Sequence, residues 1–219
     1  MKIVLPTAFF AILLIFPHAY ATDYGQLHLD DISNITRENS IITFSGTLES
    51  QDGTPLANRT IFIEDDTAYI RPDIILAIAV TDSDGKFSTT WQAVPKDNEK
   101  PFHFYAKFIG GKMYGYTRSE SWESNVVLNQ SSNHNTVPSD SIPAWFRDAS
   151  LSWHDNKIRD VDYAYAIGNL IDYDIIKSEN TPSSLHFPPW MKNDVNWWNK
   201  QLISDGDFTK SLEFMINKA

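Results

Sequence analysis

Apolar and polar residues alternate along much of the chain between residues 41 and 128. The clearest alternation covers residues 42–48, 87–91 and 102–108, where every second side chain is polar or weakly apolar. A period of two places successive side chains on opposite faces of a strand, so that one face packs on a core while the other meets water. The pattern therefore predicts half-buried antiparallel strands.

Turn signals separate these predicted strands. They occur at residues 51–55, 82–85, 95–101 and 110–111, and the first two contain an Asp-Gly pair. Asp-Gly between alternating runs is a strong hairpin signal, because the tight turn needs a positive φ at its centre. Six or seven short strands in about 90 residues predict an antiparallel β-sandwich over residues 41–128.

Several segments of this half resemble one kind of domain. Residues 44–48 (FSGTL), 52–58 (DGTPLAN) and 81–87 (TDSDGKF) are similar to parts of bacterial Ig-like and carboxypeptidase-regulatory-like domains. Residues 105–126 resemble the last strands of Ig-like repeats in surface proteins. The resemblance implies an Ig-like β-sandwich, and such domains serve as spacers, adhesins and accessory modules. The connection at residues 65–76 departs from the family, because it is longer and more aromatic than usual.

The hydrophobic period becomes helical in the second half of the chain. Residues 129–141 are polar and have no periodicity, which is typical of a linker. Beyond them, residues 143–174 align without gaps with residues 188–219 at an offset of 45, which indicates an internal duplication. The identical pairs include Pro143/Pro188, Trp145/Trp190, Trp153/Trp198, Ile158/Ile203, Asp160/Asp205 and Asp162/Asp207.

Each copy has the pattern of a helical hairpin. A proline opens the first helix, and acidic residues follow the turn, where a second helix offers free backbone N–H groups to their carboxylates. A hairpin of about 32 residues buries too little apolar surface to be stable alone. We therefore expect hairpins at residues 142–176 and 188–219, joined by a linker at 177–187. They should pack on each other or on the sandwich.

The tryptophans of the repeats divide into two groups. Four of them have the spacing of core positions and are expected to be buried: Trp145, Trp153, Trp190 and Trp198. The alternative is an exposed platform that stacks on a sugar ring. Trp197 lies about 100° around the helix from its neighbour, so it is the better candidate for an exposed contact.

The repeats also resemble sequences at the C-termini of secreted archaeal proteins, with those of ammonia-oxidising archaea as the nearest pattern. That pattern has Pro-x-Trp, a Trp-Trp pair, Gly-x-Ile-x-Asp and an aromatic residue. Here Ser152 leaves the first copy without one Trp of the pair, and Asn156 and Gln201 occupy the glycine position. The resemblance implies source and compartment rather than chemistry.

The N-terminus has the features of an export signal. Lys2 precedes an almost wholly apolar run at residues 3–16, and Ala-Tyr-Ala at 19–21 matches the small-x-small pattern that signal peptidase cleaves. We therefore expect a signal peptide at residues 1–21, then an N-terminal extension at 22–40. The alternative is an uncleaved membrane anchor. The expected location is secreted or at the cell surface.

Composition narrows the class of protein further. The chain has 18 Lys and Arg against 28 Asp and Glu, a net charge of −10, which argues against nucleic acid as a partner. It has no cysteine, so disulfides and Cys-ligated metals are excluded. A hydrophobic fraction of 42%, with 13% aromatic residues, is too high for a disordered chain.

Motifs for catalysis or metal binding are few. His154 beside Asp155 could suggest an oriented general base, but a solvated histidine at a helix end is favoured, and we expect no enzyme. We also expect no cofactor. Calcium is the one cation that the acidic clusters of the first half could hold, with turn formation as the alternative for the last two: Glu64, Asp65, Asp66, Asp82 and Asp84.

The leading hypothesis is a non-enzymatic structural or interaction protein of the cell envelope, of the adhesion type. The alternative is an extracellular ligand- or glycan-binding protein, and a hydrolase accessory protein or enzyme comes third. The expected partner is an envelope protein or glycan. The candidate contact residues lie in the 65–76 connection and on the second repeat: Tyr69, Arg71, Asp73 and Trp197. Three Asn-x-Ser/Thr sequons, at Asn34, Asn58 and Asn129, are possible glycosylation sites in an exported chain.

Overall fold

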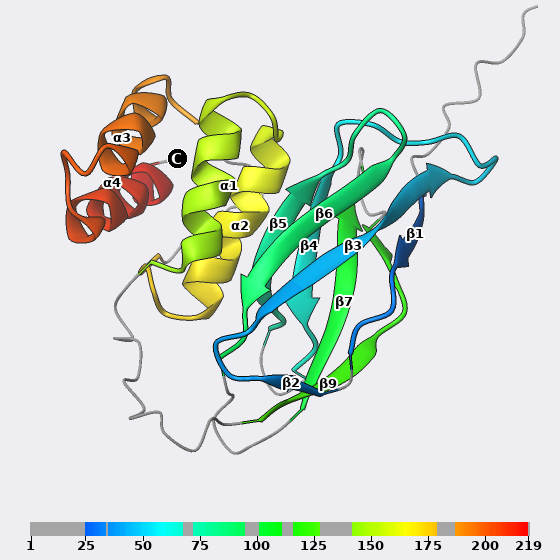
Figure 1. Cartoon of the computed structure of the whole chain (residues 1–219). Helices are drawn as coiled ribbons and strands as arrows, with labels where there is room; N and C mark the ends of the chain where they lie inside the picture. Colours follow the sequence, from blue (N-terminus) through cyan, green and yellow to red (C-terminus); the bar gives the residue numbers. More distant parts are fainter. Residues whose placement is uncertain are drawn as a thin grey trace, which may run out of the picture.

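The computed structural model describes residues 25–33, 35–67, 72–94, 101–110, 116–127, 142–178 and 187–218. Within these residues, nine strands precede four helices (Figure 1). The expected signal peptide and the 129–141 linker lie outside the described residues. Among those described, no helix is both long enough and apolar enough to cross a membrane. The chain is therefore β-rich and then helical, as the sequence predicts.

The strands form two sheets. One has the order β1–β3–β6, and the other has the order β2–β9–β7–β4–β5, with β8 paired to β7. Neighbouring strands are antiparallel except β2 and β9, so the larger sheet is mixed. The strands are β1 (Gly25–Leu29), β2 (Ile35–Arg37), β3 (Ile41–Ser50), β4 (Thr60–Asp65), β5 (Ile74–Val80), β6 (Lys86–Gln92), β7 (Phe102–Ile109), β8 (Tyr116–Arg118) and β9 (Trp122–Val127).

Both sheets contribute to one hydrophobic cluster. Along β3, Ile42, Phe44 and Leu48 are buried while the intervening side chains are more exposed, which confirms the predicted alternation. The ring of Phe44 packs edge-on against that of Phe104 on β7, with centroids 5.1 Å apart. The strand β1 lies ahead of residue 41 and pairs with β3, although its two leucines are too short an alternation to predict a strand.

The strand β4 is buried on both faces, and this joins the two halves of the molecule. Ile61 and Ile63 belong to the cluster between the sheets, whereas Phe62 belongs to a second cluster formed with the helices. Ile75 and Ile78 of β5 join Phe62 there. The helices therefore cover the outer face of β4 and β5 (Figure 1). The first hairpin packs on the strands, and the two hairpins pack on each other.

The connection between β4 and β5 is shorter than the sequence predicts. Strand β4 ends at Asp65 and β5 already begins at Ile74, so residues 74–76 are strand rather than loop. The segment Ile74–Val80 is almost continuously apolar because it packs between the two clusters. A strand buried on both faces has no alternation from which it could be recognised.

The second half consists of two helical hairpins, as predicted. The helices are α1 (Ala144–His154), α2 (Asp160–Asp172), α3 (Trp190–Asn199) and α4 (Asp205–Lys218). The second helix of each hairpin begins with the same hydrogen bond. The Asp162 carboxylate accepts from the backbone N–H of Arg159 at 3.1 Å, and Asp207 accepts from that of Ser204 at 3.2 Å. The predicted capping role of these aspartates is confirmed.

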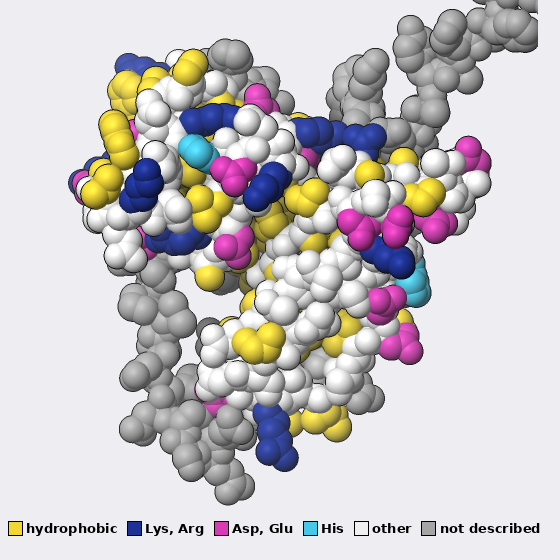
Figure 2. All heavy atoms as spheres, turned by 45° about the horizontal axis from the view of Figure 1, so that its top comes forward, with side chains coloured by type: hydrophobic (Ala, Val, Ile, Leu, Met, Phe, Trp, Pro, Cys, Tyr) yellow, Lys and Arg dark blue, Asp and Glu magenta, His cyan; other side chains and the backbone are white. Residues whose placement is uncertain are grey.

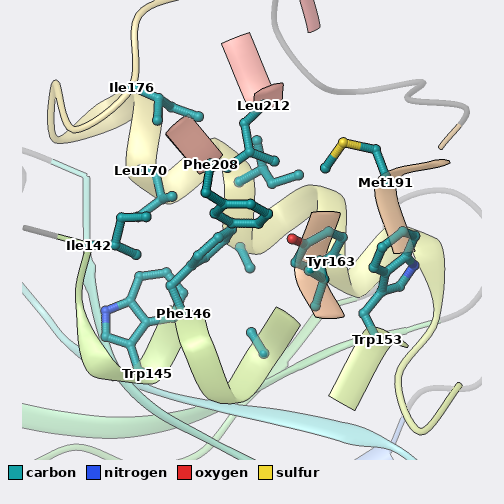
Figure 3. Close-up of a cluster of buried hydrophobic side chains, with 14 of the residues drawn as sticks. Ile142, Trp145, Phe146, Trp153, Tyr163, Leu170, Ile176, Met191, Phe208 and Leu212 are labelled. Carbon is teal, nitrogen blue, oxygen red and sulfur yellow. The ribbon is translucent and has the colours of Figure 1, made fainter. Parts of the chain in front are cut away.

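Three of the four predicted core tryptophans are buried. The Trp153 indole donates to Asp160 Oδ1 at 2.8 Å and stacks on Tyr163, and Trp198 donates to Asp205 Oδ1 at 2.7 Å. Figure 3 shows Trp145, Phe146, Tyr163 and Phe208, from three helices, within one cluster of buried side chains. The prediction for Trp190 is wrong, since 38% of its side chain is exposed.

The first helix of each hairpin ends in a left-handed residue. Asn156 and Gln201, at the position of the glycine in the archaeal pattern, both have φ of 58°. In each case the next backbone N–H bonds to the carbonyl five residues before it, Lys157 to Ser152 and Leu202 to Trp197, both at 2.8 Å. This is the Schellman arrangement, which favours glycine because a Cβ is strained at positive φ.

Replacing Gln201 by glycine should therefore stabilise the protein. We expect Q201G to raise the free energy of unfolding by about 1 kcal/mol, because the left-handed conformation costs a non-glycine residue about that much. Thermal or urea unfolding measures the difference. The control is Lys200→Gly at the preceding position, where φ is −82° and glycine should destabilise. Equal effects of the two substitutions would contradict the interpretation.

The two adjacent tryptophans of α3 should differ in their contribution to stability. Trp198 is 1% exposed, its ring stacks on that of Phe208 with centroids 4.2 Å apart, and the Arg147 guanidinium covers it. W198A should therefore lower the free energy of unfolding by about 3–5 kcal/mol. Trp197 is 45% exposed, and W197A should cost less than about 1 kcal/mol. Denaturant unfolding of the two variants tests this, and similar losses would show that Trp197 also packs in the core.

Candidate functional site

A buried polar cluster lies where α2 meets the sheet. It consists of Glu64, Asp73, Tyr105, Lys107 and Tyr165, and we call it the junction cluster. The Glu64 side chain is fully buried, and it accepts hydrogen bonds from Tyr105 Oη, from Tyr165 Oη at 2.6 Å and from Lys107 Nζ at 3.3 Å. Tyr105 Oη is also 2.5 Å from the Asp73 carboxylate. Lys107 Nζ lies 2.7 Å from Tyr165 Oη, which closes the network.

The tyrosines of the junction cluster act as hydrogen-bond donors. Burial, assisted by the negative charge of Glu64, raises the pKa of the Tyr105 and Tyr165 hydroxyls far above the ordinary value. Both therefore stay protonated at neutral pH and stabilise the buried carboxylate. The cluster holds two strands, the segment before β5 and a helix together, because its members come from β4, β7, that segment and α2.

A second set of contacts attaches α2 to the edge of the larger sheet. Asn169 accepts from the backbone N–H of Ile75 at 3.3 Å and donates to the carbonyl of Asp73 at 2.8 Å. One turn further on, Tyr173 Oη donates to the carbonyl of Pro72. These bonds satisfy backbone groups at the start of edge strand β5, which would otherwise be open to pairing with another strand.

Four of the five acidic side chains predicted for calcium are engaged by the protein itself. Glu64 belongs to the junction cluster, Asp65 accepts from the His103 backbone N–H at 3.0 Å, and Asp66 pairs with Arg118 at 2.7 Å. Asp82 accepts from two backbone N–H groups of the β5–β6 turn, at 2.8 and 2.9 Å. Across the described ranges, no three His, Asp or Glu side chains gather in a group that could hold a metal ion.

The predicted contact residues separate in the structure. Tyr69 and Arg71 lie outside the described residues, whereas Asp73 belongs to the junction cluster and Trp197 lies on the surface of α3. Of the sequons, Asn34 and Asn129 also lie outside the described residues. Asn58 is exposed, but Thr60 of its sequon is buried and donates to Asp162 Oδ2 at 2.8 Å. An enzyme that needs the Thr60 hydroxyl would therefore have to act before α2 docks.

Three large aromatic side chains are exposed on the second hairpin. Trp190 and Trp197 lie seven residues apart and thus on the same side of α3, with 38% and 45% of their surface exposed. Phe214 of α4 is 59% exposed, and its ring centroid is 6.4 Å from that of Trp190. We call these three residues the outer aromatic face. Figure 2 shows hydrophobic side chains on the surface of the helical part, while acidic side chains gather over the β-rich part.

The two hairpins pack on each other through equivalent surfaces. The guanidinium of Arg147 lies 3.8 Å from the ring centroid of Trp198, and the equivalent Lys192 lies 5.1 Å from that of Trp153. Because each cation of one copy covers the tryptophan of the other, the hairpins are related by an approximate two-fold axis. The side of hairpin 1 that packs on the sheet therefore corresponds to the outer aromatic face of hairpin 2.

The exposure of Trp190 follows from its angular position on α3. Trp190 lies eight residues before Trp198 and seven before Trp197. On an α-helix, a separation of seven residues rotates a side chain by about 20°, whereas eight residues rotate it by about 80°. Trp190 is thus closer in direction to exposed Trp197 than to buried Trp198.

No protein-family model matches this chain, and a search of curated proteins found no significant match. The site must therefore be interpreted from its own geometry. The junction cluster is enclosed between the sheet and α2, whereas the outer aromatic face is open to a partner.

Removing the Tyr165 hydroxyl should destabilise the fold. Y165F leaves the buried Glu64 carboxylate with one donor fewer, so we expect a loss of about 1–3 kcal/mol in the free energy of unfolding. The matched control is Tyr173→Phe on the same helix, whose hydroxyl bonds a carbonyl in an exposed position and should cost less than about 1 kcal/mol. Urea unfolding of both variants gives the comparison. A neutral Y165F would mean that Glu64 does not depend on this bond.

Proposed function

We propose that this protein is exported and works at the cell envelope as a non-enzymatic structural or interaction protein of the adhesion type. The observation that carries the proposal is the outer aromatic face. It belongs to a rigid hairpin whose opposite side is fixed by Trp198, Asp205 and Arg147.

Exposed aromatic side chains in this arrangement favour a binding role. Single exposed apolar residues are ordinary, but Trp190 and Trp197 lie on one side of the same helix, and Phe214 packs beside Trp190. Tryptophan is enriched among the residues that dominate binding energy, because it brings a large contact area with little loss of side-chain entropy.

The architecture supports the resemblances proposed from sequence. A β-rich region with a tight turn at Asp82–Gly85, where Gly85 has φ of 71°, fits an Ig-like domain. The left-handed residues at Asn156 and Gln201 fit the glycine of the archaeal repeat pattern. We therefore propose an Ig-like β-sandwich of about residues 41–128 with two archaeal-type helical repeats, and a surface location for the mature chain.

The titratable residues support a non-enzymatic role. The carboxylates and phenols of the junction cluster bond one another between α2 and the sheet, where they hold the fold. His154 lies at the exposed end of α1, where its ring nitrogen is 2.9 Å from the Asp155 carboxylate, and this pairing lowers the pKa of Asp155. Both features have structural explanations.

Glycan binding is the second candidate. Trp190 and Trp197 expose ring surface on the same side of α3, with Asp194 between them as a hydrogen-bonding group. An indole face beside a carboxylate suits the apolar face and the hydroxyls of a sugar ring. The partner class is thus an envelope protein or an envelope glycan.

Binding to isolated cell envelopes tests the proposal. The chain from Thr22 onward should co-sediment with envelopes of the producing organism, and the double variant W190A/W197A should lose about 10-fold or more in affinity, as expected when two hot-spot aromatics are removed. The control Ile41→Ala removes an exposed apolar side chain on β3 and should bind normally. If the partner is a protein, protease treatment of the envelopes should abolish binding. If the partner is a glycan, enzymatic removal of glycans should abolish it. Unchanged binding by the double variant would contradict the proposal.

A further inference from the structure

The outer aromatic face is the open counterpart of a surface that is already in use within the molecule. Trp145 of hairpin 1 belongs to the cluster that contains Phe62 and is 8% exposed, whereas its equivalent Trp190 is 38% exposed. Asn169 bonds to the edge of β5, whereas its equivalent Phe214 is 59% exposed. The duplication thus supplies two docking surfaces, of which one is covered by the sheet.

The substitutions between the two surfaces indicate a different kind of partner for the second one. The amide of Asn169 satisfies an N–H and a carbonyl at a strand edge, and Phe214 can do neither. Ser152 is likewise replaced by Trp197 in the second copy. The face has lost groups that suit a strand edge and gained rings that suit another apolar, aromatic helical surface.

Charge also distinguishes this hairpin from the rest of the chain. The whole chain carries a net charge of −10, yet the second repeat is neutral. Its four lysines balance four acidic residues: Lys192, Lys200, Lys210 and Lys218 against Asp194, Asp205, Asp207 and Glu213. Two copies can therefore approach through this hairpin without the mutual repulsion expected between their acidic β-rich parts.

We propose that the occupant of the outer aromatic face is the same face of a second copy of this chain. This inference rests on the proposed function, which makes the face an interaction surface, and it names the partner. A two-fold axis would bring Trp190, Trp197 and Phe214 against the same three residues of the other copy, an isologous contact that closes at two chains. Two helical hairpins would then form one bundle, with a β-rich part at each end.

Sedimentation equilibrium tests this proposal directly. The chain from Thr22 onward should have twice the mass of one chain at about 100 μM, and W190S/W197S should have the mass of a single chain at the same concentration. The double variant should keep its helical circular dichroism, since both side chains lie outside the core formed around Trp198. The control Ile35→Ser changes a more exposed apolar side chain on β2 and should leave the dimer intact.

Cross-linking locates the interface independently of stability. The chain has no cysteine, so a single introduced cysteine reports on one position. Asp194 lies between the two exposed tryptophans on α3, so the proposed contact places it in the interface. D194C should therefore form covalent dimers at least 10-fold faster than S88C on the exposed face of β6 when treated with a short thiol-reactive cross-linker.

Three results would overturn the proposal: a monomeric wild-type chain, a dimer that persists in W190S/W197S, or equal cross-linking of D194C and S88C. These failures are separate from a failure of the proposed function. If the wild-type chain is a monomer and W190A/W197A no longer binds envelopes, the proposed interaction role stands and only the second copy as partner is contradicted. If the wild-type chain is a dimer but W190A/W197A binds envelopes normally, the second copy stands as the partner and the proposed envelope contact of this face is contradicted.

Discussion

The packing of α2 on the outer face of β4 and β5 is the contact on which the rest of this structure depends. It gives β4 a core on each side, Ile61 and Ile63 toward the second sheet and Phe62 toward the helices. It also covers a fully buried carboxylate, Glu64, whose charge is tolerable only because tyrosine and lysine donors surround it. Apolar burial supplies the attraction, and the junction cluster adds a requirement for one geometry, because a displaced helix would leave Glu64 without its donors.

The second hairpin depends on the first in turn. Each repeat contains the same local unit, an indole that donates to the aspartate seven residues later and stacks on the aromatic ring ten residues later. The unit fixes the turn within a hairpin. The two hairpins are then joined by Arg147, which covers the ring of Trp198, and by Lys192, which covers that of Trp153. Duplication of a docking unit leaves its second docking side open at the end of the molecule. This explains why aromatic exposure concentrates there rather than on the β-rich part.

Much of the fold could be predicted from local pattern, and most of the site could not. Alternation identified β3 and β7, and the repeat alignment placed the starts of α2 and α4 at Asp160 and Asp205. The start of β5 was placed too late because its segment is buried on both faces and does not alternate. The junction cluster was missed because Glu64 and Tyr165 are 101 residues apart, and no spacing in the sequence pairs them. Glu64 was instead assigned to calcium, the simplest role for adjacent acidic residues.

The sequence by itself determined what depends on neighbours along the chain: strand or helix, the turns, the caps and the duplication. Only the tertiary structure decided which of two equivalent surfaces is covered. Trp145 and Trp190 occupy the same place in their repeats, yet Trp145 is 8% exposed in the cluster that includes Phe62 of the sheet, and Trp190 is 38% exposed. Burial is a property of what packs from elsewhere in the chain, and helical periodicity records only the direction in which a side chain points.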